Sequence, residues 1–343
     1  MNKNQLEEYV EGRDELDGEL QESQTGPRVA RKRESKRREA DARLFIRAQE
    51  AGGQFKFTYK AARFEEAWLL DALLAIADQQ WITDVLRKAK GGKEASVYLC
   101  KTGPAIPEAS HVAAKIYRPR ALRNLKDDHE YRVGRVDLGV DGKRITREAD
   151  IHAIAKRTTY GEELRHQSWI AYEFNALEVL FKAGADVPRP YALAGNAILM
   201  DFVGDELGSA PTLNEVALER AEALVLFERV MQNVETFLKH GFVHGDLSAY
   251  NILYWHGDIT LIDLPQVVSP TANPNAYRIF ARDVKRLCDY FAKQGVDSDP
   301  RRLARDLWAG TGHAERGSPD PRFLDPEDPR DRQFWEKESG QKR

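Results

Sequence analysis

Cysteine is scarce in this sequence, and no apolar stretch is long. The two cysteines, Cys100 and Cys288, lie far apart and lack the spacing of a metal site, which is typical of reduced, buried thiols in a cytoplasmic protein. The richest apolar stretch, residues 68–77, is interrupted by Asp71 and is too short to span a membrane. The amino terminus is acidic rather than basic and apolar, which is not the pattern of a signal peptide.

An excess of charge of either sign is also missing from the chain as a whole. The formal net charge is −3, from 52 basic and 55 acidic residues, so no general affinity for nucleic acid follows. The 343 residues can form one large two-lobed domain with tails, or two ordinary domains, and either buries a sizeable core.

Both ends of the chain are highly charged. Residues 1–26 carry eight acidic and two basic residues, whereas residues 28–47 carry nine basic and three acidic ones. We therefore expect residues 1–54 to form a disordered arm or a lone solvated helix, and residues 311–343 a charged tail. The basic part of the arm, residues 28–47, could bind RNA or an acidic partner, or could simply pair with the acidic part; the sequence leaves both open.

The motif that carries chemistry is VHGDLSAYNIL, residues 243–253, followed by Leu-Ile-Asp at residues 261–263. Phosphoryl transfer needs positioned carboxylates and a held metal ion rather than covalent chemistry. Asp246 would face the attacking hydroxyl, Asn251 and Asp263 would bind magnesium, and His244 precedes Asp246 as in kinase catalytic loops. The alternative is a solvated turn between two strands, in which Asp and Asn serve turn chemistry alone.

Upstream of this motif the pattern predicts a small, mostly β lobe over residues 81–200. A helix over residues 55–80, with its apolar face in residues 64–79, would pack on the lobe, and a short strand would follow at residues 81–86. Next comes KGGKEASVY, residues 90–98, a glycine loop between strands that suits kinases. Of the three glycine positions in GxGxxGxV only one is filled, by Gly92, so an ordinary hairpin turn is the alternative.

Two further segments supply a candidate ion pair. Lys115 lies in the alternating strand VAAKIY, residues 112–117, where it would hold nucleotide phosphates; an edge-strand lysine pointing to water is the alternative. Glu173, in a helix over residues 169–182, is its candidate partner, with Glu178 and Glu163 as rivals. The alternative is that Glu173 faces solvent on the helix and does not pair with Lys115.

The remaining segments place a hinge and a helical lobe over residues 201–310. An apolar strand at residues 197–200 runs into Asp-Phe-Val-Gly, so Met200 would lie beside adenine and the backbone of residues 201–203 would bond it; a strand turning into a loop is equally consistent. Apolar residues of a first predicted helix run from Leu213 through Val216 and Leu224 to Phe237, and a second helix spans residues 275–294. Too few residues lie between Asp263 and the second predicted helix for an activation segment.

Taken in order, GGKEASVY, VAAKIY, WIAYEFNAL, ILMDFVG, HGDLSAYNIL and LIDLPQ resemble the RIO family of atypical serine/threonine protein kinases, over roughly residues 81–291, and most closely its branch without an amino-terminal winged helix. The resemblance implies an α+β, two-lobed protein-kinase-like fold, use of ATP and Mg²⁺, and Asp246 and Asp263 as catalytic residues. Asp263 would also form a phospho-aspartate in ATPase action. The nucleotide contacts implied are Gly92, Lys93, Glu94, Val97, Lys115, Glu173, Met200, Asp201, Phe202 and Val203.

By this resemblance the chain is expected to be a non-specific serine/threonine protein kinase that phosphorylates itself, acts in the cytoplasm and serves small ribosomal subunit maturation. Lys90 stands where the family usually has serine or threonine, and the polar insertion at residues 118–147 does not follow the family pattern, which leaves partner choice open. Two other functions fit parts of the sequence. Aminoglycoside and choline kinase-like enzymes share the HGDLxxxNIL pattern, and a ribonucleoprotein scaffold could use ATP as a shape switch.

Overall fold

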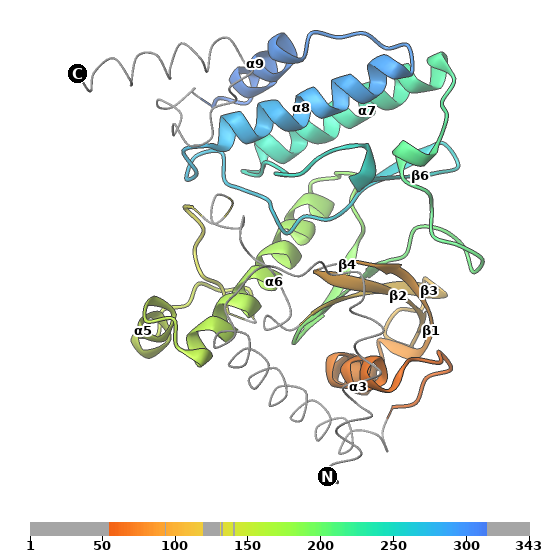
Figure 1. Cartoon of the computed structure of the whole chain (residues 1–343), viewed down its shortest axis with the longest axis vertical. Coiled ribbons are helices and arrows are strands. Elements are labelled where there is room, and N and C mark those ends of the chain that lie inside the picture. Colours follow the sequence, from red (N-terminus) through yellow and green to blue (C-terminus); the bar gives the residue numbers. More distant parts are fainter. Residues whose placement is uncertain (1–54, 93, 119–130, 132, 140, 314–343) are drawn as a thin grey trace, which may run out of the picture. The chain divides into compact units, whose positions relative to one another are not determined.

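The structure, a computed structural model, describes residues 55–92, 94–118, 131, 133–139 and 141–313 (Figure 1). Two compact units are distinguished: the first lies within Met1–Leu125, Asp137–Phe174 and Pro188–Ser209, the second within Lys126–Val136, Asn175–Val187 and Ala210–Arg343. Among the described residues, no helix combines the length and apolar character needed to cross a bilayer. The predicted arm, residues 1–54, and nearly all of the predicted tail lie outside the described residues.

The first unit is built on a five-stranded antiparallel sheet in the order β1-β2-β3-β5-β4. Its strands are β1 (Ile82–Gly91), β2 (Ala95–Thr102), β3 (His111–Tyr117), β4 (Pro190–Ala194) and β5 (Ala197–Asp201). The first strand is longer than the predicted strand at residues 81–86, because it continues until it meets the glycine hairpin. β3 lies in the middle of the sheet, so the interpretation of Lys115 as an edge-strand residue was wrong.

The two faces of this sheet carry different sets of side chains. Successive side chains of a strand point to opposite faces. Tyr98, Ala114 and Leu199 belong to the apolar core that the sheet forms with helix α3 (Arg63–Asp78). Val97, Lys115 and Ile198 are paired across β2, β3 and β5, so they share the other face. The packing of the predicted amino-terminal helix on the sheet therefore leaves Lys115 on the face away from that helix.

Helix α3 is joined to the sheet by a buried carboxylate as well as by apolar contacts. Glu65, which is 7% exposed, accepts hydrogen bonds from the Tyr98 hydroxyl at 2.6 Å and from the Tyr59 hydroxyl at 3.2 Å. The ammonium group of Lys88, on β1, lies 3.1 Å from the same carboxylate. Burial and the neighbouring carboxylate raise the pKa of Tyr98, so its hydroxyl stays a donor.

Two helices follow the insertion. α5 (Glu148–Ala155) contains no buried residue, and α6 (Thr159–Lys182) is longer than the predicted helix at residues 169–182. Residues up to Phe174 of α6 belong to the first unit. The chain leaves this unit after Ser209, later than the predicted boundary at residues 200–201.

The second unit is mainly helical. Helices α7 (Arg220–Lys239) and α8 (Ala276–Lys293) lie side by side, with the rings of Phe227 and Phe291 5.3 Å apart (Figure 1). The prediction of one helix from Leu213 onward was wrong, because residues 213–215 form a separate 3-10 turn, η2 (Leu213–Glu215), closed by a Thr212 capping box, and Val216 is extended. Leu224 was also wrongly placed in the core; it is 50% exposed, since Ala223 and Leu226 occupy the buried stripe.

Short elements complete this unit. The 3-10 turn η3 (Ala249–Asn251) leads into the hairpin β6 (Ile252–Trp255) and β7 (Asp258–Leu261). Helix α9 (Pro300–Gly310), which the sequence analysis did not predict, begins at an Asp299 cap with proline in its first turn and packs on α8. Cys288 is buried on α8, and burial raises the pKa of its thiol, as expected of a packing residue.

We predict that Glu65→Ala lowers the free energy of unfolding of the first unit by about 1–3 kcal/mol, because it leaves the buried Tyr98 hydroxyl without its acceptor. Glu66→Ala is the matched control: Glu66 lies in the same first turn of α3 but is exposed, so the change should stay within about 0.5 kcal/mol. Urea denaturation followed by circular dichroism measures both. Equal effects of the two substitutions would contradict the buried role of Glu65.

Candidate active site

The first unit contains the predicted ion pair between lysine and glutamate. Lys115 Nζ lies 2.7 Å from Glu173 Oε1, and the two side chains are 9% and 2% exposed. The rival Glu178 instead contacts Lys182 on the outside of α6. Two opposite charges removed from water persist only when each compensates the other, so the pair fixes the ammonium group at one place on the sheet.

Tyr117 supports this pair, although the sequence analysis assigned it no role. Its hydroxyl donates to Glu173 Oε2, the carboxylate oxygen that does not bind Lys115. The ring of Tyr117 meets that of Trp169 edge to face at 4.9 Å, and Lys115 Nζ lies 5.3 Å from the same ring. Both oxygens of Glu173 are therefore engaged, and the helix that carries Glu173 is held against β3.

The glycine hairpin lies next to this lysine in the sheet. Val97 is directly opposite Lys115 in the β2–β3 register. A Cβ atom at Gly92 would come within 2.8 Å of the Ala95 carbonyl oxygen, so glycine allows the tight backbone approach there. Glu94 accepts a hydrogen bond from the amide of Arg118 through its backbone carbonyl, and Lys93 lies outside the described residues.

The predicted adenine segment follows at the end of β5. Met200 is opposite Ala113 and so shares the sheet face of Lys115, and it is 9% exposed. The amide of Asp201 already donates to the Arg189 carbonyl at 2.9 Å, which makes it unavailable to a base. The backbone carbonyl of Asp201 and the backbone groups of Phe202 and Val203 therefore stay as the predicted contacts to a base.

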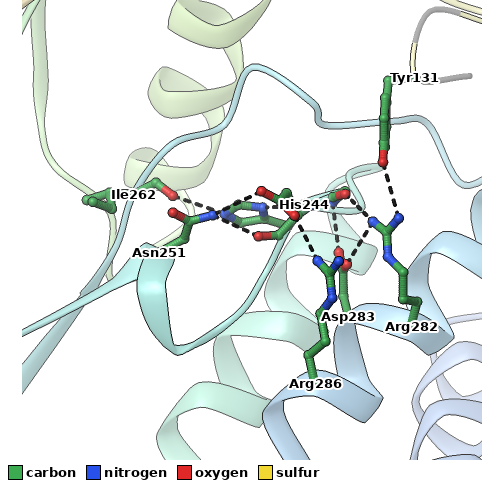
Figure 2. A network of polar contacts seen from close by, with 9 residues as sticks. Tyr131, His244, Asn251, Ile262, Arg282, Asp283 and Arg286 are labelled. Carbon is green, nitrogen blue, oxygen red and sulfur yellow. Dashed lines mark hydrogen bonds and ion pairs between the residues drawn. The ribbon is translucent and has the colours of Figure 1, made fainter. Parts of the chain in front are cut away.

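In the second unit, the loop that begins at Val243 is pinned at several points. Val243 exchanges backbone hydrogen bonds with Val268 at 2.8 and 2.9 Å. Gly245 has φ +88°, and a Cβ there would lie 2.3 Å from the Gln266 carbonyl oxygen, so no other residue fits. Its amide donates to Asp283 Oδ2 of α8 at 2.9 Å (Figure 2).

Asp283 and Arg282 form the buried end of this network. Asp283 is 2% exposed, and burial raises its pKa to about 6 despite the adjacent guanidinium of Arg282. Arg282 donates to the Gly245 carbonyl oxygen, to Asp283 Oδ1 at 3.2 Å and to the Tyr131 hydroxyl at 3.2 Å (Figure 2). Both polar groups of the Gly245 backbone are thus satisfied by neighbouring residues of one helix.

His244 joins the two loops that carry the candidate site residues. Its Nε2 lies 3.1 Å from the Ile262 carbonyl oxygen, and its Nδ1 accepts from the Asp246 amide at 3.3 Å (Figure 2). A carbonyl can only accept and an amide can only donate, so the ring must carry its proton on Nε2 and be neutral. Burial lowers the pKa of His244, which outweighs the raising effects of the Ile262 bond and of the Asp263 and Asp246 charges.

Asp246 and Asn251 are in direct contact. Asn251 Nδ2 donates to the Asp246 backbone carbonyl at 2.8 Å and lies 3.5 Å from its Oδ2. Arg286 of α8 approaches the other oxygen, Oδ1, at 2.8 Å (Figure 2). The Asp246 side chain remains 45% exposed, so the carboxylate is oriented from two sides and still accessible to an incoming hydroxyl.

Asp263 is brought beside these residues by backbone pairing. The amide of the preceding Ile262 donates to the Asn251 carbonyl at 2.9 Å. Asp263 has φ +70°, a left-handed conformation that aspartate adopts more readily than most residues. The structure thus brings the loop of Asp246 and Asn251 and the loop of Asp263 together beside His244.

These oxygen-bearing side chains fit a hard divalent cation. Among the described residues no three His, Cys, Asp or Glu side chains gather into a metal cluster, and Mg²⁺ in nucleotide sites needs only one or two carboxylates with phosphate oxygens and water. Asn251 uses its amide nitrogen on Asp246, which leaves its oxygen as the ligand atom. Asn251 and Asp263 are thus of the right chemical type to hold magnesium.

Part of the polar insertion contributes to this unit. Arg135 donates to the carbonyl oxygens of Pro265 and Val267, at 2.8 and 2.6 Å, in the segment just after Asp263. Tyr131 contacts Arg282, as noted. At these two positions the insertion therefore braces the site loops, while residues 119–130 lie outside the described residues.

Asp283 and Arg286 were not among the residues predicted from the sequence. For Asp283 a signal was present, because an aspartate lay on the apolar stripe of the predicted helix between Phe280 and Leu287. A charged residue on a buried face needs a partner, which here is the Gly245 amide. For Arg286 no comparable signal existed, because an arginine on the polar face of a helix is ordinary.

An antiparallel-sheet unit and a helical unit that carries these loops define an α+β, protein-kinase-like fold. The particular family follows from comparison with known proteins. Residues 96–303 match the RIO domain, and the chain belongs to that family.

Relatives with known names agree with this assignment. The RIO-type serine/threonine-protein kinase Rio1 of Haloferax volcanii is 31% identical over 210 residues, which cover 61% of this chain and 63% of that protein. The serine/threonine-protein kinase RIO1 of Chaetomium thermophilum is 28% identical over 238 residues, covering 66% of this chain and 43% of that protein. The chain thus spans under two thirds of the length of both relatives.

A solved structure shows a weaker likeness. The crystal structure of the Rio2 kinase-ADP/Mg2+-phosphoaspartate complex from Chaetomium thermophilum gives a TM-score of 0.47 at 19% identity, and the match covers 78% of this chain and 79% of that one.

We predict a stability change with pH that His244 causes. Because the folded pKa of His244 is lowered, its contribution is fully present above the unfolded value of about 6.5 and is lost as pH falls through the folded pKa. The difference in unfolding free energy between the wild-type chain and His244→Asn should therefore shrink between about pH 7 and pH 5. Urea titrations at each pH measure it, and a difference that stays constant or grows on acidification would contradict a neutral, buried imidazole.

Proposed function

We propose that this chain is an ATP- and Mg²⁺-dependent serine/threonine protein kinase of the RIO type that also phosphorylates itself. The observation that supports it most directly is the Asp246–Asn251 contact beside the loop of Asp263, all joined through His244. An oriented carboxylate next to an oxygen ligand pair is the minimum that phosphoryl transfer from a metal nucleotide requires. Membership of the RIO family and the names of the relatives support the same reaction.

The proposed roles follow from what each side chain can do. Asp246 orients the acceptor hydroxyl and accepts its proton as the oxygen attacks the γ-phosphorus and ADP leaves. Lys115, fixed by Glu173, neutralises phosphate charge. Asn251 and Asp263 hold magnesium, which when bound neutralises the negative charge of the phosphates.

Nucleotide binding in the first unit is proposed for the residues that share the Lys115 face and for those that flank it. Val97 and Met200 would contact the base from β2 and β5, and the backbone around Gly92 would approach the phosphates. Phe202 and Val203 would bond adenine through their backbone groups. Lys93, Glu94 and the backbone carbonyl of Asp201 remain predictions from the sequence alone.

A slower ATPase reaction is included in the proposal. Attack of the Asp263 carboxylate on the γ-phosphorus would form an acyl phosphate and release ADP, and water would then hydrolyse it to inorganic phosphate. The support for this role is that the backbone pairing of Ile262 with Asn251 holds Asp263 beside the residues proposed to take the metal nucleotide. Such turnover could switch the chain between nucleotide states.

The partners proposed are a protein substrate and, through residues 28–47, the small ribosomal subunit or its RNA in the cytoplasm. The support is the excess of nine basic over three acidic residues in this segment, together with two cysteines that are free and buried thiols.

We predict that Asp246→Ala reduces phosphate transfer at least about 100-fold, because the acceptor hydroxyl loses its base, while nucleotide affinity stays close to wild type. The measurements are incorporation of labelled γ-phosphate into the chain and into casein, and titration with fluorescent ADP. Asp258→Ala is the matched control: Asp258 is an exposed aspartate of the same unit whose partner is Arg229, and its loss should leave transfer unchanged. Undiminished labelling by Asp246→Ala would refute the assigned role.

A second prediction concerns the arm. Deletion of residues 1–50 should abolish co-sedimentation with small ribosomal subunits at low salt, because it removes the whole basic segment, and should leave self-labelling intact. Unchanged co-sedimentation would show that these residues do not recruit that partner.

A further inference from the structure

A polar cleft of about 710 Å³ opens beside Asp246 in the second unit. One wall is the end of the catalytic loop with η3, from Asp246 to Asn251, and η2 contributes Asn214. The other wall is the face of α8 that carries Arg286, Asp289, Tyr290, Lys293 and Gln294. Asp246 and Asn251 have roles in the proposed mechanism, but the wall on α8 has none beyond the contact of Arg286 with Asp246.

The wall on α8 is set by helical spacing. Asp289 and Tyr290 lie three and four positions after Arg286, and Lys293 lies four and three positions after them, so these residues share one side of the helix, and the C-cap Gln294 follows them. This side differs from the buried face of α8, which carries Phe280, Val284 and Leu287. The Tyr290 hydroxyl donates to the Leu213 carbonyl at 2.7 Å and so ties η2 to α8 across the cleft.

The charged side chains on the walls differ in whether they form ion pairs. Asp246 is paired with Arg286 at 2.8 Å, and Asp289 is paired with Lys285 at 2.7 Å. Lys293 is exposed, and within the described part of the chain no ion pair is found for it. The cleft therefore presents one uncompensated positive charge at the end of α8 farther from Asp246.

We infer that this cleft receives the acceptor protein as an extended serine- or threonine-containing segment, and that Lys293 selects an acidic side chain about three residues from the acceptor residue. The inference rests on the proposed role of Asp246 and adds a substrate class to it. Recognition is electrostatic: a carboxylate of the acceptor segment meets the ammonium group of Lys293 while the hydroxyl meets Asp246.

The spacing follows from standard dimensions. Arg286, which contacts Asp246, and Lys293 are seven positions apart on α8, and a rise of about 1.5 Å per residue puts them about 10 Å apart along the helix axis. An extended peptide covers about 3.3 Å per residue, so about three residues span this distance. The bound segment can lie along α8 in either direction. This direction decides whether the acidic residue precedes or follows the acceptor residue.

The test uses the full chain with magnesium-ATP and nine-residue peptides of alanine and glycine with one central serine. One peptide has aspartate three residues after the serine, one has it three residues before, and the reference has asparagine at both positions. We expect one aspartate peptide to show a kcat/KM about two- to fivefold above the reference, the size of a partly exposed ion pair. This preference should weaken at high salt.

Charge reversal identifies the residue. Lys293→Glu should invert the preference, so that the peptide with lysine at the selected position is used better than the one with aspartate. Lys239→Glu, which changes the net charge equally at an exposed site on α7 outside the cleft, should keep the wild-type preference.

Three results would overturn the inference. They are equal use of all peptides by the wild-type chain, a preference that survives Lys293→Glu, and a preference that Lys239→Glu abolishes just as completely. In each of these cases the peptides would still be phosphorylated, so the proposed kinase function would still hold. Absence of labelling of every peptide and of the chain itself would overturn the proposed function, and the inference with it.

Discussion

The second unit depends on one neutral imidazole. His244 is buried, accepts from the Asp246 amide and donates to the Ile262 carbonyl, so it links the loop of the candidate base to the loop of the candidate metal ligand. The bond from the Asp246 amide does not tolerate the charged ring, because an imidazolium has no acceptor nitrogen, whereas the bond to the Ile262 carbonyl persists in either state. The link between His244 and the Asp246 loop therefore depends on Nδ1 staying unprotonated.

The surrounding polar contacts reinforce the same arrangement from α8. Asp283 and Arg282 satisfy the amide and carbonyl of Gly245, whose left-handed backbone turns the loop between His244 and Asp246. Arg286, one turn further along the same helix, contacts the Asp246 carboxylate itself. One amphipathic helix thus buries its apolar face in the core, fixes the loop with its edge and lines the cleft with its polar face.

In the first unit, a sheet holds the candidate site residue Lys115 in a fixed place. Helix α3 covers one face through apolar packing and the Glu65 carboxylate, so the opposite face is left to Lys115 and its neighbours. Glu173 then receives both Lys115 and Tyr117, which makes the ammonium group part of a buried, hydrogen-bonded pair. A charge that would otherwise be costly to bury becomes a fixed point on the sheet.

Much of this could be predicted from the sequence, where spacing and residue type are decisive. The Asp246, Asn251 and Asp263 pattern and the Lys115 partner at Glu173 depend on local motifs, and the structure brings the members of each set together. Helix ends were less predictable: Leu213 and Leu224 are apolar residues whose placement depends on a 3-10 turn and on which stripe faces the core. Contacts such as Arg286 with Asp246 depend on tertiary structure, and no local pattern marks them.

The most direct test of the account is a mass-spectrometric map of the purified wild-type chain after incubation with magnesium-ATP, read under conditions that preserve acyl phosphates. We predict phosphate on serine or threonine, with any further phosphate on Asp263 and ADP as the product. A chain that carries no phosphate on any residue, in a mixture in which ATP remains intact, would contradict it.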